Sequence, residues 1–207
     1  MKIQPEELAD HHFTLLNSMA HHELIPFVKT YLSKRTFFSA ACYLLQFISF
    51  GVLLFFFLKF HRINGMRAVQ AFQYFMVGLS IAMCLIPLHE WIHVLAYKVM
   101  GAQHTSYNMN LKKFYFLAVA HRFVASRKEF MVVALAPVTI ISLILIMAVF
   151  FAGPNWSIAW LTTLMVHASF CSGDFALLVF FEVNSDKEAV TYDDKEKNIS
   201  FFYGRPK

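Results

Sequence analysis

Three long stretches without charged side chains constrain this 207-residue chain more than any other feature. Residues 36–58 and 68–88 contain no Asp, Glu, Lys or Arg, and neither does the 44-residue stretch 130–173. A helix of roughly 20 apolar residues crosses a hydrocarbon core about 30 Å thick, so the first two stretches fit one span each. The third stretch is long enough for two spans, and Gly153-Pro154-Asn155 is the turn expected between them.

We therefore predict an all-α membrane protein with four transmembrane helices, near residues 36–60, 68–100, 129–152 and 155–182. Pro5 with two acids after it, and Pro26 further on, predict an amphipathic interfacial helix over 5–24. The predicted organisation is an N-terminal cytoplasmic segment 1–35, a membrane-embedded domain 36–183 with a cytoplasmic loop 101–128, and a polar cytoplasmic tail 184–207. Within the tail, residues 199–203 are expected to form a short strand.

The composition agrees with a membrane protein and gives an orientation. Hydrophobic residues make up 58% of the chain and charged residues 15%, which excludes a disordered chain and argues against a soluble globule. Fifteen of the 18 Lys and Arg residues fall in the N-terminal segment, the loop 98–128 and the tail. Because basic loops stay cytoplasmic, we predict a multi-pass protein of the cell membrane with both termini in the cytoplasm. The net charge of +5 then reflects contact with the lipid bilayer and not with nucleic acid.

The residues His89-Glu90-Trp91-Ile92-His93 form an H-E-x-x-H motif at the inner end of the second apolar stretch. Residues four apart lie on one face of a helix, so His89 and His93 can bind one metal ion. Glu90 would then stand beside the metal as a base for water. Ionisable side chains within a membrane span are costly and by default indicate a functional site. A polar cluster that only pairs helices through hydrogen bonds is the alternative.

A hydrolytic zinc site usually has three protein ligands and a water, so a third ligand is needed. Asp174 is the only acidic residue between Glu129 and Glu182. The predicted helices that carry His89 and Asp174 both run from the outer to the inner side of the membrane. At 1.5 Å per residue, each residue lies about 15–18 Å from the inner end of its helix. Their similar depth makes Asp174 the predicted third ligand, although pairing with a histidine in the absence of metal would also explain it.

Three neighbours of Asp174 are weaker candidates. Gly173 precedes it and would let another backbone approach closely. His167 lies two helical turns before Asp174 and could line a polar pocket, although a helix-packing hydrogen bond explains it too. Cys171 could be a soft metal ligand, and it ranks below Asp174.

These residues and their placement resemble a known class of membrane enzyme. An H-E-x-x-H inside one membrane helix with an acidic ligand in a later helix resembles the site-2 protease class of intramembrane metalloproteases, and the details are most similar to the bacterial putative zincin peptidase membrane family. The similarity covers about residues 68–182, and its motifs are HEWIHVLA at 89–96, Gly101-Ala102, SRKEF at 126–130, Ala136-Pro137 and Ser172-Gly173-Asp174. The resemblance implies one zinc ion per chain held by His89, His93 and Asp174, with Glu90 as the base. Site-2 proteases usually have Gly after their Asp, whereas here it comes before.

The leading interpretation is a zinc metalloendopeptidase that hydrolyses peptide bonds within or next to the membrane. Its substrate would be a membrane-anchored or membrane-inserted peptide or protein, which the loop 102–128 could hold as an added strand. Two other interpretations use the same residues. A non-catalytic membrane-helix binding protein would not depend on them, and a divalent-metal binding or transport protein would need His89, His93 and Asp174 but not Glu90.

Overall fold

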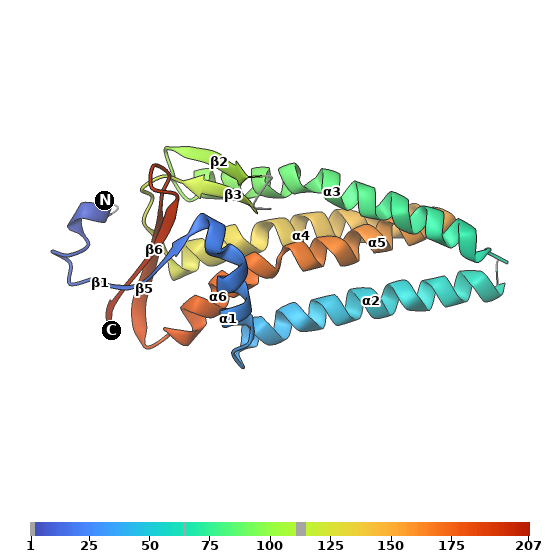
Figure 1. Ribbon diagram of the computed structural model, residues 1–207, viewed down its shortest axis with the longest axis horizontal. Coiled ribbons are helices and arrows are strands. Elements are labelled where there is room, and N and C mark those ends of the chain that lie inside the picture. Colours follow the sequence, from blue (N-terminus) through green and yellow to red (C-terminus); the bar gives the residue numbers. More distant parts are fainter. Residues whose placement is uncertain (1–2, 64, 111–114) are drawn as a thin grey trace. The chain divides into compact units, whose positions relative to one another are not determined.

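In the computed structural model, which describes residues 3–63, 65–110 and 115–207, four helices are long and apolar enough to cross a membrane. The four predicted helices are therefore present, with boundaries that agree to about three residues, and each is a candidate span. The helices are α1 (Leu24–Leu32), α2 (Phe37–Ile63), α3 (Ala68–Val99), α4 (Arg127–Phe151), α5 (Pro154–Phe170) and α6 (Ser172–Val183), with the 3-10 helices η1 (Pro5–Glu7) and η2 (His21–Glu23) (Figure 1). The last span is divided at Cys171 into α5 and α6.

The prediction of an all-α fold is wrong, because strands make up 17% of the structure beside 65% helix. The strands are β1 (Thr14–Ala20), β2 (Thr105–Asn110), β3 (Tyr115–Ala120), β4 (Ala125–Ser126), β5 (Lys187–Asp194) and β6 (Ile199–Pro206). An antiparallel sheet has the order β1-β6-β5-β4, and β2 pairs with β3. The region 101–128 therefore contains two paired strands and a short third one, and residues 111–114 lie outside the described part.

The N-terminal segment, predicted as an interfacial helix over 5–24, contains β1 instead. β1 pairs with β6 from the other end of the chain, with Thr14 opposite Gly204 and Ala20 opposite Ile199. The C-terminal strand β6 and the N-terminal strand β1 accordingly lie side by side (Figure 1). The proline and acids that favour a helix form only the three-residue η1. A strand partner supplied by the fold has overridden the local helix signals.

The tail confirms the strand predicted over 199–203 and extends it. β6 runs from Ile199 to Pro206 and alternates between more and less buried side chains, with Phe202 completely buried. β5 pairs with it along its whole length, from Lys187 opposite Pro206 to Asp194 opposite Ile199. The period of two in burial is that of a sheet with one face packed against other elements.

The chain divides into two compact units. Unit 1 consists of Met1–Ser39, Glu90–Ala136 and Gly173–Lys207, and unit 2 consists of Ala40–His89 and Pro137–Ser172. The predicted division into 1–35, 36–183 and 184–207 follows membrane location, and it stays a prediction.

In unit 1, α6 packs against the sheet through aromatic side chains. The ring of Phe180 lies 4.5 Å from that of Phe202 in β6, and Phe202 also stacks on Phe27 of α1 at 5.7 Å. The Glu182 carboxylate accepts hydrogen bonds from the backbone N–H groups of Phe37 and Phe38, at 2.7 and 3.0 Å. These donors belong to the first turn of α2, where a carboxylate satisfies free N–H groups and the helix dipole. Such contacts fix α6, whose first turn carries Asp174.

In unit 2, α2, α3 and α5 share an apolar core that includes Leu53, Ala71 and Ile158. α3 and α5 approach closely at Gly78, where an added Cβ would collide with the backbone carbonyl of Ala159. Thr163 donates a hydrogen bond from its Oγ1 to the Gly78 carbonyl at 3.0 Å. Small residues and a hydroxyl bond across helices are the usual means of packing helices in a membrane, where lipid is as apolar as the core.

Candidate metal centre

The H-E-x-x-H motif lies in the last third of α3, which continues through Pro87 as one helix to Val99. His89 and His93 are one helical turn apart, and each is only 7% exposed, whereas Trp91 between them is 48% exposed. The histidines therefore share the buried face of α3, as the spacing predicted. His89 is the last residue of its segment in unit 2, and Glu90 begins the next segment of unit 1. The two residues are consecutive in the uninterrupted helix α3.

Within unit 1, the structure brings His93 and Asp174 together. His93 Nε2 lies 3.1 Å from Asp174 Oδ1, and His93 Nδ1 lies 3.0 Å from the Val133 carbonyl oxygen in α4. A carbonyl can only accept, so Nδ1 must carry the proton that donates to it. A neutral His93 then turns the lone pair of Nε2 toward a carboxylate oxygen. Two acceptors this close need a cation between them, which is either a proton or a metal ion.

This donor set fits zinc. An imidazole nitrogen and a carboxylate oxygen are both common ligands of Zn²⁺. The bond from Nδ1 to a backbone carbonyl is the usual outer partner of a metal-binding histidine, because it fixes the ring and its tautomer. α4, which carries Val133, begins with a capping box in which the Ser126 N–H donates to Glu129 Oε2 at 2.9 Å.

Asp174 lies in the first turn of α6, directly after the break at Cys171. The first turn of a helix lies at the positive end of the helix dipole, which attracts negative charge. A Cβ added at Gly173 would lie 4.0 Å from a Leu24 methyl carbon, an ordinary contact. The predicted close approach of another backbone is therefore not found at Gly173 among the described residues.

Glu90 points toward the β2–β3 hairpin in unit 1. Its Oε2 accepts a hydrogen bond from the backbone N–H of Ala118 in β3 at 2.6 Å. Ala118 is opposite Tyr107 in β2. The carboxylate of the motif is thus placed beside β3.

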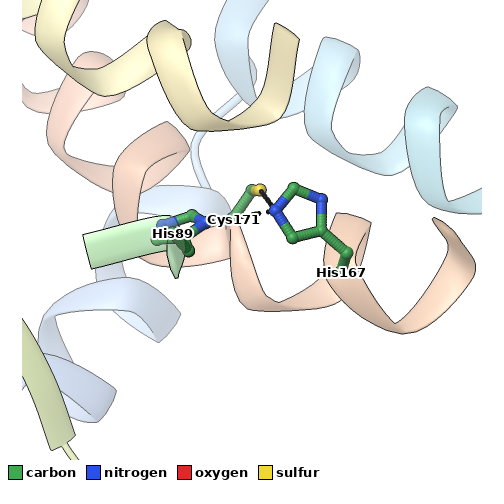
Figure 2. A group of neighbouring side chains, drawn as sticks. All are labelled: His89, His167 and Cys171. Carbon is green, nitrogen blue, oxygen red and sulfur yellow. Dashed lines mark hydrogen bonds between the residues drawn. The ribbon is translucent and has the colours of Figure 1, made fainter. Parts of the chain in front are cut away.

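Within unit 2, the structure places His89 beside two weaker candidates. His89 Nδ1 lies 3.2 Å from His167 Nε2, and Cys171 Sγ lies 3.9 Å from the same nitrogen (Figure 2). The structure therefore brings His167 to His89. Spacing could have pointed to Cys171, since it follows His167 by four residues. The Val133 carbonyl and the Ala118 amide have no signal in the sequence, because every residue carries the same backbone groups.

Comparison with known proteins adds one finding. The model of a family described as Putative zincin peptidase matches residues 82–188, slightly more than half of the chain. The matched region contains the H-E-x-x-H motif, the β2–β3 hairpin, Val133 and Asp174. No curated protein and no solved structure gives a significant match.

Proposed function

The chain belongs to the putative zincin peptidase family, and from this we propose that it is an intramembrane zinc metalloendopeptidase that cleaves peptide bonds within or next to the membrane. Membership of the family indicates a zinc metallopeptidase at the level of enzyme class. The intramembrane character of the proposal rests on the four apolar helices, two of which carry the motif and Asp174.

The observation that carries the proposal is the arrangement around His93. Its Nδ1 is engaged by the Val133 carbonyl while its Nε2 faces the Asp174 carboxylate. We propose that His93, Asp174 and His89 hold one zinc ion per chain, with His89 contributed from the same face of α3 one turn earlier. Three protein ligands of this type are the composition of a catalytic zinc site. Zinc held there would supply Lewis-acid chemistry, polarising the peptide carbonyl and making water more acidic.

Glu90 is the proposed general base. Its carboxylate would take the proton from the attacking water and deliver it to the amine that leaves. In the structure this carboxylate accepts the Ala118 N–H, which keeps it oriented toward the hairpin. A general base is effective only when it is held within hydrogen-bond reach of the proton that it abstracts, and the amide restricts its rotation.

The proposed substrate is a membrane-anchored or membrane-inserted peptide. Its backbone is hydrogen-bonded as a helix in the bilayer, so it must unwind before a peptide bond is accessible. An extended chain would be added beside β3 near Ala118, whose N–H donates to Glu90. A substrate segment added there would replace the hydrogen bonds that it loses on unwinding and would lie next to the proposed base.

Metal content tests the ligand set. In a Cys171→Ser background, which removes a candidate soft ligand outside the catalytic set, we expect about one zinc per chain with or without Glu90→Gln. Zinc should be lost when His89→Ala, His93→Ala or Asp174→Ala is added, because each removes one of three ligands. Elemental analysis of each variant, after size-exclusion chromatography has shown that it is folded, gives the answer. Full zinc content in Asp174→Ala would exclude it as a ligand, and the absence of metal from all folded variants would overturn the peptidase proposal.

A further inference from the structure

His89, His167 and Cys171 form a second group of metal-ligating side chains, which lies entirely in unit 2. One ligand atom from each residue lies within 4.8 Å of the others. All three residues are buried, and His167 and Cys171 are completely so. Figure 2 shows the ring of His167 with the imidazole of His89 and the sulfur of Cys171 on the side of its Nε2 nitrogen. The peptidase mechanism makes no use of Cys171.

The distances suit a tetrahedral ion. With metal bonds of about 2.0 Å to nitrogen and 2.3 Å to sulfur, tetrahedral ligands lie about 3.3 Å apart for two nitrogens and about 3.6 Å for nitrogen and sulfur. The corresponding distances are 3.2 Å from His89 Nδ1 to His167 Nε2 and 3.9 Å from His167 Nε2 to Cys171 Sγ. These two distances lie within a few tenths of an ångström of the tetrahedral values, and all three ligand atoms lie within 4.8 Å of one another.

The backbone fixes two of the three ligands. His167 and Cys171 are four residues apart, and the Cys171 N–H donates to the His167 carbonyl at 3.2 Å in the last turn of α5. They therefore share one face of the helix, as two ligands of one ion must. His89 approaches from α3, whose contact with α5 at Gly78 and Thr163 belongs to the same unit.

We propose that His89, His167 and Cys171 bind one thiophilic divalent cation, such as Zn²⁺ or its analogues Cd²⁺ and Co²⁺, at a position distinct from the proposed catalytic one. Two imidazoles and a thiolate are softer than the His₂-carboxylate set and favour such ions. The two positions have His89 in common. An ion bound by the unit 2 cluster occupies His89, which is also a ligand in the proposed catalytic set. Excess thiophilic metal should therefore inhibit the peptidase.

Cobalt spectroscopy tests the cluster without any measurement of peptidase activity. Co²⁺ bound to a thiolate gives an intense sulfur-to-metal charge-transfer absorption, whereas Co²⁺ on imidazole and carboxylate alone does not. We expect this absorption when the full-length, metal-stripped protein in detergent is titrated with Co²⁺. It should remain in His93→Ala, which disables only the proposed catalytic set, and disappear in Cys171→Ser. In His167→Ala the apparent affinity for Co²⁺ should fall at least about tenfold.

Two matched controls identify the sulfur. Cys84 is exposed on α3 and Cys42 is buried in α2, and neither Cys84→Ser nor Cys42→Ser should change the absorption. The proposal is overturned if folded wild type and folded His93→Ala show no thiolate absorption at saturating Co²⁺, or if Cys171→Ser leaves it unchanged. Failure here does not affect the peptidase proposal, which predicts that Cys171→Ser keeps its zinc. Conversely, thiolate absorption in Asp174→Ala would support the cluster even if that residue proved not to be a catalytic ligand.

Discussion

Both histidines of the motif engage a partner through Nδ1. His93 donates from Nδ1 to the Val133 carbonyl in unit 1, and His89 Nδ1 contacts His167 Nε2 in unit 2. Each ring therefore has its Nε2 on the side away from that partner. Metal-binding histidines are commonly held in this manner, because the outer bond sets the tautomer and the ring orientation. His167, which the sequence offered as a pocket residue, is in our proposal a ligand of the second ion, and without that ion its Nε2 contacts His89 Nδ1.

The role proposed for Glu90 predicts a separation between metal binding and catalysis. Glu90→Gln keeps the size of the side chain but removes the base, so peptide cleavage should fall about 10²–10⁴-fold while zinc is retained. The measurement is cleavage of a model membrane peptide in proteoliposomes, with Glu23→Gln as a control on an exposed glutamate of η2. Full activity of Glu90→Gln would contradict the mechanism.

Buried His21 makes the stability of unit 1 depend on pH. His21 is 1% exposed, and burial lowers its pKa from 6.5 to about 4 because the charged imidazolium is desolvated. The unfolded chain therefore binds a proton that the folded chain excludes. The stability contributed by neutral His21 is present above pH 6.5 and is lost as the pH falls toward 4, by up to about 3 kcal/mol.

This pH dependence can be checked by comparing thermal unfolding at pH 7 and pH 4.5. Wild type should lose more stability on acidification than His21→Gln, in which the titrating group is absent. The neighbouring His22 is exposed, so His22→Gln should behave like wild type. An equal loss of stability in wild type and His21→Gln would show that His21 is not responsible.

At the scale of elements, the break at Cys171 and the crossing at Gly78 position the two groups of ligands. The break places Asp174 in the first turn of α6, although the apolar run through 130–173 gives no sign of it. The crossing brings α3 against α5 closely enough for Thr163 to reach the Gly78 carbonyl. His89 and His167 lie further along the same two helices.

Gly78→Ala should destabilise unit 2. Its new Cβ would meet the Ala159 carbonyl and the Thr162 side chain, so the helices would have to separate, at a cost of about 1–3 kcal/mol. Gly51 in α2 is the matched control, since no atom of the described residues lies within 4 Å of a Cβ added there, and Gly51→Ala should be neutral or slightly stabilising. Thermal unfolding in detergent measures both, and equal stabilities of the two variants would contradict a tight crossing.

At the scale of the whole molecule, strand pairing in unit 1 connects three distant parts of the chain. β1 from the N-terminal segment pairs with β6, and β4 from the region 101–128 pairs with β5. Paired strands must lie on the same side of a membrane. Two candidate spans separate β1 from β4, and two more separate β4 from β5, so the strand pairing and the number of spans are consistent with each other.

The charge distribution predicts which side this is. Reporter fusions at the N-terminus and at the C-terminus should both indicate the cytoplasm, and a reporter inserted at residues 153–155 should indicate the opposite side, because the basic residues are concentrated in the parts that pair. Opposite locations of the two termini would contradict the β1–β6 pairing as well as the orientation.

The sequence by itself determined the four long apolar helices and the face of α3 that carries the two histidines. Both follow from local rules, since the length of an apolar run decides whether it can cross a bilayer and a spacing of four residues decides which side chains share a helix face. The sequence also pointed to Asp174, because an isolated carboxylate in an apolar stretch needs a partner.

Only the tertiary structure decided what surrounds these residues. The N-terminal segment has local helix signals but forms strand β1, because it pairs with β6 more than 170 residues away in the sequence. The Val133 carbonyl, the Ala118 amide and the contact of His89 with His167 and Cys171 depend on which helices and strands meet. Backbone groups are the same at every position and long-range contacts are absent from any local window, so their roles emerge only when the chain is folded.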